Sequence, residues 1–338
     1  MSETKNIAAI AGKIQNDIFK VFHWELHAQE DTNFDCVCED HVSDKGAKKI
    51  SHPGDVVYHY FDPYANRRIF LHTDLKAYAK KSIQQTKIRE ALKSLAMTIE
   101  CAAITNSWRT KFQATEEGPY EVRGLLFVAN HDNKTPARFR ELLNGIALKN
   151  IPVARGQILH ILGPDNIADL YSIATDIKLS IADKKIGASY RFFYPDLTLW
   201  KRHTAEDERV GATIEMLLSP YFVLKHSQVT DENGTTTQRR GSIVYYSRPG
   251  STVEEFVYLL DSLSRYQLVN SQEDLRVRVY CRNGSEDIKN NFDKAKKRYC
   301  QMWGFEGGRE QEVTSITIDS IQQIAPNYKA NELGWSER

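Results

Sequence analysis

The sequence predicts an α/β fold over residues 1–200, followed by a smaller α+β domain over residues 210–338. Short apolar strand patterns alternate with amphipathic helix patterns along most of the chain, which is typical of α/β proteins. A polar, charged stretch at residues 201–211 separates two such series. The chain has 338 residues, more than one hydrophobic core usually holds. We therefore predict two domains with their boundary in that stretch.

The most informative element is a predicted β-hairpin within residues 52–81. Residues 56–61 are mostly β-branched or aromatic, which favours a half-buried strand. Residues 62–66 (DPYAN) supply turn chemistry, because proline restricts the backbone and Asp and Asn bond their own main chain. Ile69, Phe70 and Leu71 then resume the apolar pattern of a second strand.

Three charged side chains are expected to meet on this hairpin. Asp74 and Lys76 are two residues apart on the second strand, so they project from the same face. Asp55 opens the first strand and is expected to lie across from them. The chain holds six acid-x-Lys tripeptides, and only the Asp74 copy follows an apolar strand with another acid across a hairpin. The alternative is a cross-strand charge pair on a solvated sheet face.

The surrounding sequence predicts the other elements of the first domain. Apolar residues at helical spacing, such as Ile88, Leu92 and Leu95, form one face of a helix over residues 84–103. The run YEVRGLLFVAN at residues 120–130 predicts a buried strand. The remaining predicted elements are a helix over 7–22, a strand within 24–38, a helix over 137–147, a strand over 157–162, a helix over 167–181, and a strand over 190–194 that would extend the same sheet.

Pro53-Gly54-Asp55 followed by Asp74-Leu75-Lys76 resembles the signature of the PD-(D/E)xK nuclease superfamily, whose fold is restriction-endonuclease-like. The resemblance covers roughly the first half of the chain. It implies an α-β-β-β-α-β core, and the predicted elements follow that order. One departure is that Gly54 separates the proline from the acid.

The resemblance also implies a mechanism. Asp55, Asp74 and the Leu75 carbonyl would bind Mg²⁺ or Mn²⁺, which prefer oxygen ligands. Lys76 would orient the attacking water or neutralise charge on the phosphate. Many members add an acid from the first helix, and here the matching residue is Gln15, a neutral supporting ligand.

These residues predict a metal-dependent endonuclease that hydrolyses DNA, in anti-phage defence or restriction. Two alternatives stay open: a catalytically silent nuclease-fold subunit that binds DNA or a partner, and a nuclease that cleaves RNA. Arg67, Arg68, Lys80 and Lys81 are candidate phosphate contacts. The expected partners are DNA and either a companion subunit or a second copy of the chain.

Net charge, apolar runs and cysteine count indicate where and how the protein acts. The formal net charge is +1, so binding to nucleic acid would need a local basic surface or a basic partner. No apolar run is long enough to span a bilayer, and no secretory leader is evident. The five cysteines are odd in number and scattered, which favours a reducing compartment and predicts a cytoplasmic protein.

A second metal site is a separate question. Cys36, Cys38, His41 and His52 offer two thiols and two imidazoles, a donor set that suits structural zinc. The cysteines are separated by one residue rather than the commoner two to four, and both also fit as small apolar residues in a strand. The sequence leaves both interpretations open.

The second domain has a β-α-β-β-α-β rhythm, which predicts an α+β sandwich, possibly ferredoxin-like. Its strands are expected at residues 220–226, 242–247, 275–281 and 313–318, with helices at 253–264 and 286–302. No residue pattern in this part indicates a particular function, so we predict an accessory or interaction domain.

Overall fold

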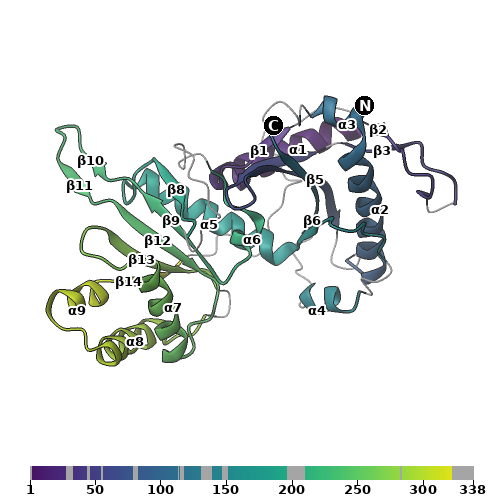
Figure 1. The fold of residues 1–338 in the computed structure, drawn as a ribbon. Coiled ribbons are helices and arrows are strands. Elements are labelled where there is room, and N and C mark those ends of the chain that lie inside the picture. The colour runs from purple at the N-terminus through teal and green to yellow at the C-terminus, as the bar shows by residue number, and fades with distance from the viewer. Residues whose placement is uncertain are drawn as a thin grey trace. The chain divides into compact units, whose positions relative to one another are not determined.

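The structure is a computed structural model that describes residues 2–27, 33–43, 46–54, 56–78, 83–112, 114, 118–130, 139–146, 151–195, 210–281 and 284–321. It divides into two compact units (Figure 1). The described residues up to Tyr171 form the first unit, and those from Ser172 form the second. The predicted boundary stretch lies outside the described residues apart from its last two positions.

The first unit is built on a five-stranded mixed sheet in the order β1-β4-β5-β6-β7. Strands β1, β4 and β5 are antiparallel neighbours, and β6 and β7 continue parallel to β5. The strands are β1 (Glu25–His27), β4 (Val57–Asp62), β5 (Arg67–Tyr78), β6 (Tyr120–Asn130) and β7 (Leu159–Leu162). The helices are α1 (Ser2–Asp17), the 3-10 helix η1 (Phe19–Phe22), α2 (Gln85–Ile104), α3 (Asn106–Lys111), α4 (Phe139–Asn144) and the start of α5 (Pro164–Ala182).

The predicted hairpin is confirmed as β4 and β5, and its turn follows from side-chain chemistry. The Asp62 carboxylate accepts the backbone N–H groups of Tyr64 and Ala65 at 2.9 and 3.0 Å. Asn66 adopts the left-handed conformation at φ 50°, which asparagine tolerates better than most residues. These bonds close the chain on itself and set the register in which Val57 pairs with His72.

Helix α2 connects β5 to the parallel strand β6 and covers one face of the sheet (Figure 1). Its apolar side packs on Phe70 of β5 and on Val122 and Leu126 of β6. The predicted single strand within residues 24–38 is instead divided: Glu25–His27 joins the main sheet, whereas Phe34–Asp35 (β2) pairs with Ser51–His52 (β3) in a separate two-stranded sheet.

The second unit also has a five-stranded mixed sheet, in the order β14-β13-β12-β9-β8. Strands β8, β9 and β12 are antiparallel neighbours, and β13 and β14 continue parallel to β12. The strands are β8 (Tyr190–Phe192), β9 (Tyr221–His226), β12 (Gly241–Tyr246), β13 (Asp274–Val279) and β14 (Thr317–Ser320), with the hairpin β10 (Val229–Thr230) and β11 (Thr236–Gln238) beside them. The helices are the rest of α5, then α6 (Ile214–Leu217), α7 (Val253–Arg265), α8 (Ile288–Trp303) and α9 (Gly307–Thr314).

Two predictions about this unit are wrong. Strand β8 does not extend the first sheet, because it pairs with β9. The unit is not ferredoxin-like, because the strands that α7 and α8 connect are adjacent parallel neighbours in the sheet. In the ferredoxin-like fold another strand lies between the two strands of each such β-α-β unit. The two sheets share a connectivity: three strands in antiparallel contact, then two crossovers to parallel strands. None of the described helices is long and apolar enough to cross a membrane.

Candidate functional site

The predicted acid and lysine lie side by side near the end of β5. Lys76 Nζ is 2.8 Å from Asp74 Oδ1, and the two side chains are a third and a quarter exposed. Both residues share the face of Phe70, because side chains alternate along a strand. That face is the one covered by α2, so the pair points into the space between β5 and the helix.

A cavity of about 330 Å³ opens at this pair. Ser94, Leu95 and Thr98 of α2 form one wall, and β5 forms the other. Pro53 and Val56, from the segment that leads into β4, complete the lining. The residues on β5 that line the cavity are His72, Thr73, Asp74, Leu75 and Lys76. The lining therefore combines a carboxylate, an ammonium, hydroxyls and an imidazole with an apolar floor.

His72 connects the two parts of the predicted motif. It is fully enclosed, and burial lowers the pKa of its imidazole to about 4, so the ring is neutral at pH 7. A hydrogen bond from the ring to the Pro53 carbonyl acts in the opposite direction with a smaller effect on the pKa. This bond ties the start of the Pro53-Gly54-Asp55 segment to β5, two residues before Asp74. The sequence analysis did not include His72, although its position two residues before Asp74 on the same strand face is a signal that could have indicated it.

Asp55 lies outside the described residues, but its neighbours on either side are placed. The Thr73 N–H donates to the Val56 carbonyl at 2.9 Å, which continues the β4–β5 pairing past Val57. Pro53 lines the cavity, as does Val56.

Gln15 is not brought to Asp74. Its side-chain amide donates to the Trp24 carbonyl at 2.6 Å and holds the end of α1 against the entry to β1. Helix α1 contacts the sheet through Tyr58, whose hydroxyl donates to the Ala11 carbonyl at 3.1 Å. Tyr58 pairs with Leu71 and shares its face, which is opposite to that of Asp74.

Two of the basic residues predicted to contact phosphate lie far from Asp74. Arg67 and Arg68 lie at the opposite end of β5, and Arg68 is about 20 Å along the strand from Asp74. Arg67 is 3.5 Å from the Glu121 carboxylate, and Arg68 contacts the His59 imidazole at 3.1 Å. Lys80 and Lys81 lie outside the described residues.

The matching strands of the second unit have no acid-x-Lys pair. Val57 of β4 pairs with His72, and the equivalent first residue of β9, Tyr221, pairs with Tyr246. Asp74 and Lys76 follow His72 by two and four residues. The residues that follow Tyr246 by the same intervals are Arg248 and Gly250. The shared connectivity is therefore not accompanied by the same chemistry.

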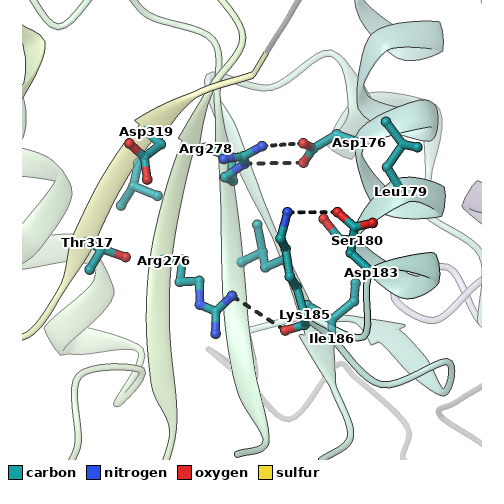
Figure 2. A pocket seen from close by; sticks show the side chains of 12 residues that line it. Asp176, Leu179, Ser180, Asp183, Lys185, Ile186, Arg276, Arg278, Thr317 and Asp319 are labelled. Carbon is teal, nitrogen blue, oxygen red and sulfur yellow. Dashed lines mark hydrogen bonds and ion pairs between the residues drawn. The ribbon is translucent and has the colours of Figure 1, made fainter. Parts of the chain in front are cut away.

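The second unit has a charged cavity of its own, of about 420 Å³ (Figure 2). Its charges are largely paired within the unit. Asp176 binds the Arg278 guanidinium through both carboxylate oxygens, and Lys185 Nζ is 2.8 Å from Asp183. Positive and negative side chains both line this cavity. Its described residues therefore do not form the cluster of positive charge that binding to a phosphate backbone requires.

Comparison with known proteins assigns the first unit. Residues 1–166 belong to the PD-(D/E)XK nuclease superfamily, as the resemblance predicted. The family model that they match is described as the GAPS4 protein PD-(D/E)XK nuclease domain. Comparison with curated proteins and with solved structures gives no match.

The donor atoms on β5 suit the divalent metals that nucleases of this superfamily generally use. Asp74 supplies a carboxylate whose side chain is a quarter exposed, and Leu75, which carries a main-chain carbonyl, lines the same cavity. Hard cations such as Mg²⁺ and Mn²⁺ take oxygen ligands of these two kinds. The donors among the described residues therefore fit such a metal.

Proposed function

We propose that the first unit is a metal-dependent endonuclease that hydrolyses DNA phosphodiester bonds at the cavity beside Asp74. The observation that carries the proposal is the Asp74–Lys76 pair, 2.8 Å apart, on the strand face that opens into a cavity beside Pro53. The matched family model makes this domain a nuclease, and the pair lies within the matched residues. By resemblance, the biological setting is anti-phage defence or restriction.

In this proposal Asp55, Asp74 and the Leu75 carbonyl hold Mg²⁺ or Mn²⁺. Such a cation, when bound, supplies positive charge against the phosphate and acidifies water for attack. Asp74 then has two neighbours of positive charge, the cation and the Lys76 ammonium. The exposed fraction of Asp74 lets the cation enter without displacing core side chains.

Lys76 is the residue that we assign to the reacting phosphate. Its side chain is a third exposed and lines the cavity from the same strand face as the carboxylate. A compact cation at that place can contact a phosphate oxygen or hold the attacking water, and both roles stabilise the charge that develops in the transition state. His72 acts as a positioning residue, because it contacts the Pro53 carbonyl rather than the reacting atoms.

The test is cleavage of plasmid DNA, linear duplex DNA and RNA by the purified full chain with Mg²⁺, Mn²⁺ or chelator. Asp74→Asn and Lys76→Met are expected to lower cleavage by about 10²-fold or more, since removing one group that stabilises transition-state charge has that effect. The matched control is Asp183→Asn with Lys185→Met, a second acid-x-Lys pair with the same 2.8 Å separation in the other unit. These control variants are expected to keep wild-type cleavage.

The outcomes separate the alternatives. Cleavage of DNA that requires metal and is lost only in the β5 variants supports the proposal. Cleavage of RNA alone would assign the RNA-cleaving alternative. Metal-independent binding of DNA without cleavage, unchanged in both β5 variants, would assign the catalytically silent subunit. Equal cleavage by wild type and by Asp74→Asn would refute the site.

A further inference from the structure

Four side chains with metal-binding atoms converge beside α2, away from the β5 site. Cys36 follows β2, His41 lies in the connection after it, His52 is on β3, and Cys101 is on α2. The sulfur or ring-nitrogen atoms of all four lie within 4.8 Å of one another. The helix thus supplies a ligand from more than 60 residues away that the sequence analysis did not include.

Four of the six separations between these atoms match the edges of a zinc tetrahedron, and the other two are within 4.8 Å. With Zn–S bonds of about 2.3 Å and Zn–N bonds of about 2.0 Å, two sulfurs are about 3.8 Å apart, sulfur and nitrogen about 3.5 Å, and two nitrogens about 3.3 Å. Here Cys36 Sγ and Cys101 Sγ are 3.8 Å apart. His41 Nδ1 is 3.5 Å from each sulfur. His41 Nδ1 and His52 Nε2 are 3.4 Å apart.

The outer hydrogen bonds leave a lone pair on each imidazole directed at the cluster. His41 Nε2 lies 3.3 Å from the Glu100 carboxylate, which only accepts, so this nitrogen carries the proton. The Thr98 hydroxyl donates to the Ser94 carbonyl at 2.9 Å and therefore accepts from His52 Nδ1 at 3.3 Å. In the neutral rings the two remaining nitrogens face each other with lone pairs, an arrangement that a bound cation satisfies. Protein ligands to zinc regularly have such partners on their second nitrogen.

Burial indicates a structural role rather than a catalytic one. His52 and Cys101 are completely buried and His41 is 3% exposed, so the cluster is closed to solvent on most sides. Four protein ligands also fill the tetrahedral coordination of zinc and leave no position for substrate. Cys38 is adjacent, with its sulfur 3.6 Å from that of Cys101, but it is not one of the four mutually close residues.

We propose that Cys36, His41, His52 and Cys101 form a structural zinc site that joins the β2–β3 segment to helix α2. The zinc site is connected to the cavity beside Asp74 at two places, one on the β2–β3 segment and one on α2. His52 directly precedes Pro53 in the chain, and Thr98, which holds the His52 ring, lines the cavity together with Ser94. Zinc therefore holds the segment that carries Asp55 against the helix that forms the cavity wall. The site goes beyond the proposed nuclease function and does not depend on it.

The first experiment is metal analysis of the purified full chain, without a histidine tag, by inductively coupled plasma mass spectrometry. We expect one zinc per chain in the wild type and less than a tenth of that in Cys101→Ser and in Cys36→Ser. Two cysteine variants are matched controls that should keep full zinc: Cys300→Ser, which is buried in the second unit, and Cys38→Ser. Asp74→Asn should also keep it, which separates this zinc from the metal of the β5 site.

A second measurement does not require that the variants fold. Wild-type protein reconstituted with Co²⁺ should show the visible bands of tetrahedral cobalt and near-ultraviolet thiolate charge transfer, and X-ray absorption of the zinc form should give two sulfur and two nitrogen ligands. Absence of zinc and cobalt binding in folded wild type would overturn the proposal, as would a disulfide between Cys36 and Cys101. Loss of zinc in Cys38→Ser but not in His52→Gln would overturn the ligand assignment.

Discussion

Gly124 offers a quantitative test of how tightly α2 is packed on the sheet at the candidate site. It lies on β6 opposite His72 of β5, on the face that α2 covers. A Cβ added at this position would be 2.4 Å from Leu159 Cδ2 and 3.1 Å from both Cδ2 and Cγ of Leu95. Leu95 is 2% exposed and lines the cavity that contains Asp74, so it has little room to withdraw.

The expected cost of Gly124→Ala follows from these contacts. The Leu159 methyl is the end of a half-buried side chain and can turn away, whereas the branch point of Leu95 must shift with its helix. Overpacking of this kind lowers the free energy of unfolding by about 1–3 kcal/mol. Displacement of Leu95 also narrows the cavity, so cleavage should fall even at temperatures where the variant is fully folded.

Gly12→Ala is the matched control, and it is expected to change the free energy of unfolding in the opposite direction. Gly12 is inside helix α1, and no atom lies within 4 Å of the added Cβ. Alanine is more favourable than glycine in a helix interior by about 0.5–1 kcal/mol, so this variant should be more stable than wild type. The two substitutions therefore differ by about 1.5–4 kcal/mol in unfolding free energy, although each adds the same methyl group.

The assay is urea unfolding followed by tryptophan fluorescence, since Trp24 and Trp108 are both buried in the first unit. A change in the midpoint at constant slope reports stability alone. If Gly124→Ala were as stable as wild type, or if the two variants shifted the midpoint in the same direction, the reasoning about packing between α2 and β6 would be refuted.

Two further predictions concern buried polar groups. Burial, with smaller contributions from His27 and Arg68, lowers the pKa of His59 to about 3, against about 6.5 for an unfolded histidine. Between these two pH values the unfolded chain binds more protons than the folded chain, so the free energy of unfolding falls as the pH falls. His59→Gln lacks this group, so its free energy of unfolding should fall by about 2 kcal/mol less than that of the wild type between pH 7 and pH 4.5. Parallel pH profiles of stability for the two proteins would contradict this. In the second unit, the Tyr245 hydroxyl donates to the Asp176 carboxylate at 2.9 Å (Figure 2 shows the carboxylate beside Arg278), so Tyr245→Phe should cost about 1–2 kcal/mol in urea unfolding, and a change below about 0.3 kcal/mol would count against that bond.

The sequence alone was sufficient for the parts of the site that depend on local geometry. The side-chain period of a strand placed Asp74 and Lys76 on one face, and the chemistry of residues 62–66 predicted the turn that closes β4 on β5. These relations hold within a few residues, where bond angles and steric exclusion leave few alternatives. The Pro53-Gly54-Asp55 and Asp74-Leu75-Lys76 motifs, together with the order of the predicted elements, also indicated the superfamily that the comparison found.

Tertiary structure decided which distant elements meet. Periodicity shows that β8 is a strand, but only packing assigned it to the second sheet, and only the crossover helices made β12, β13 and β14 parallel. Gln15 is on the helix that the motif requires, yet α1 covers the face opposite Asp74. In the sequence, Cys101 is one of several small residues on the buried face of a helix. Only the tertiary structure places its sulfur beside that of Cys36. A sequence pattern determines which face a side chain takes, whereas its partner across that face depends on the free energy of packing the whole chain.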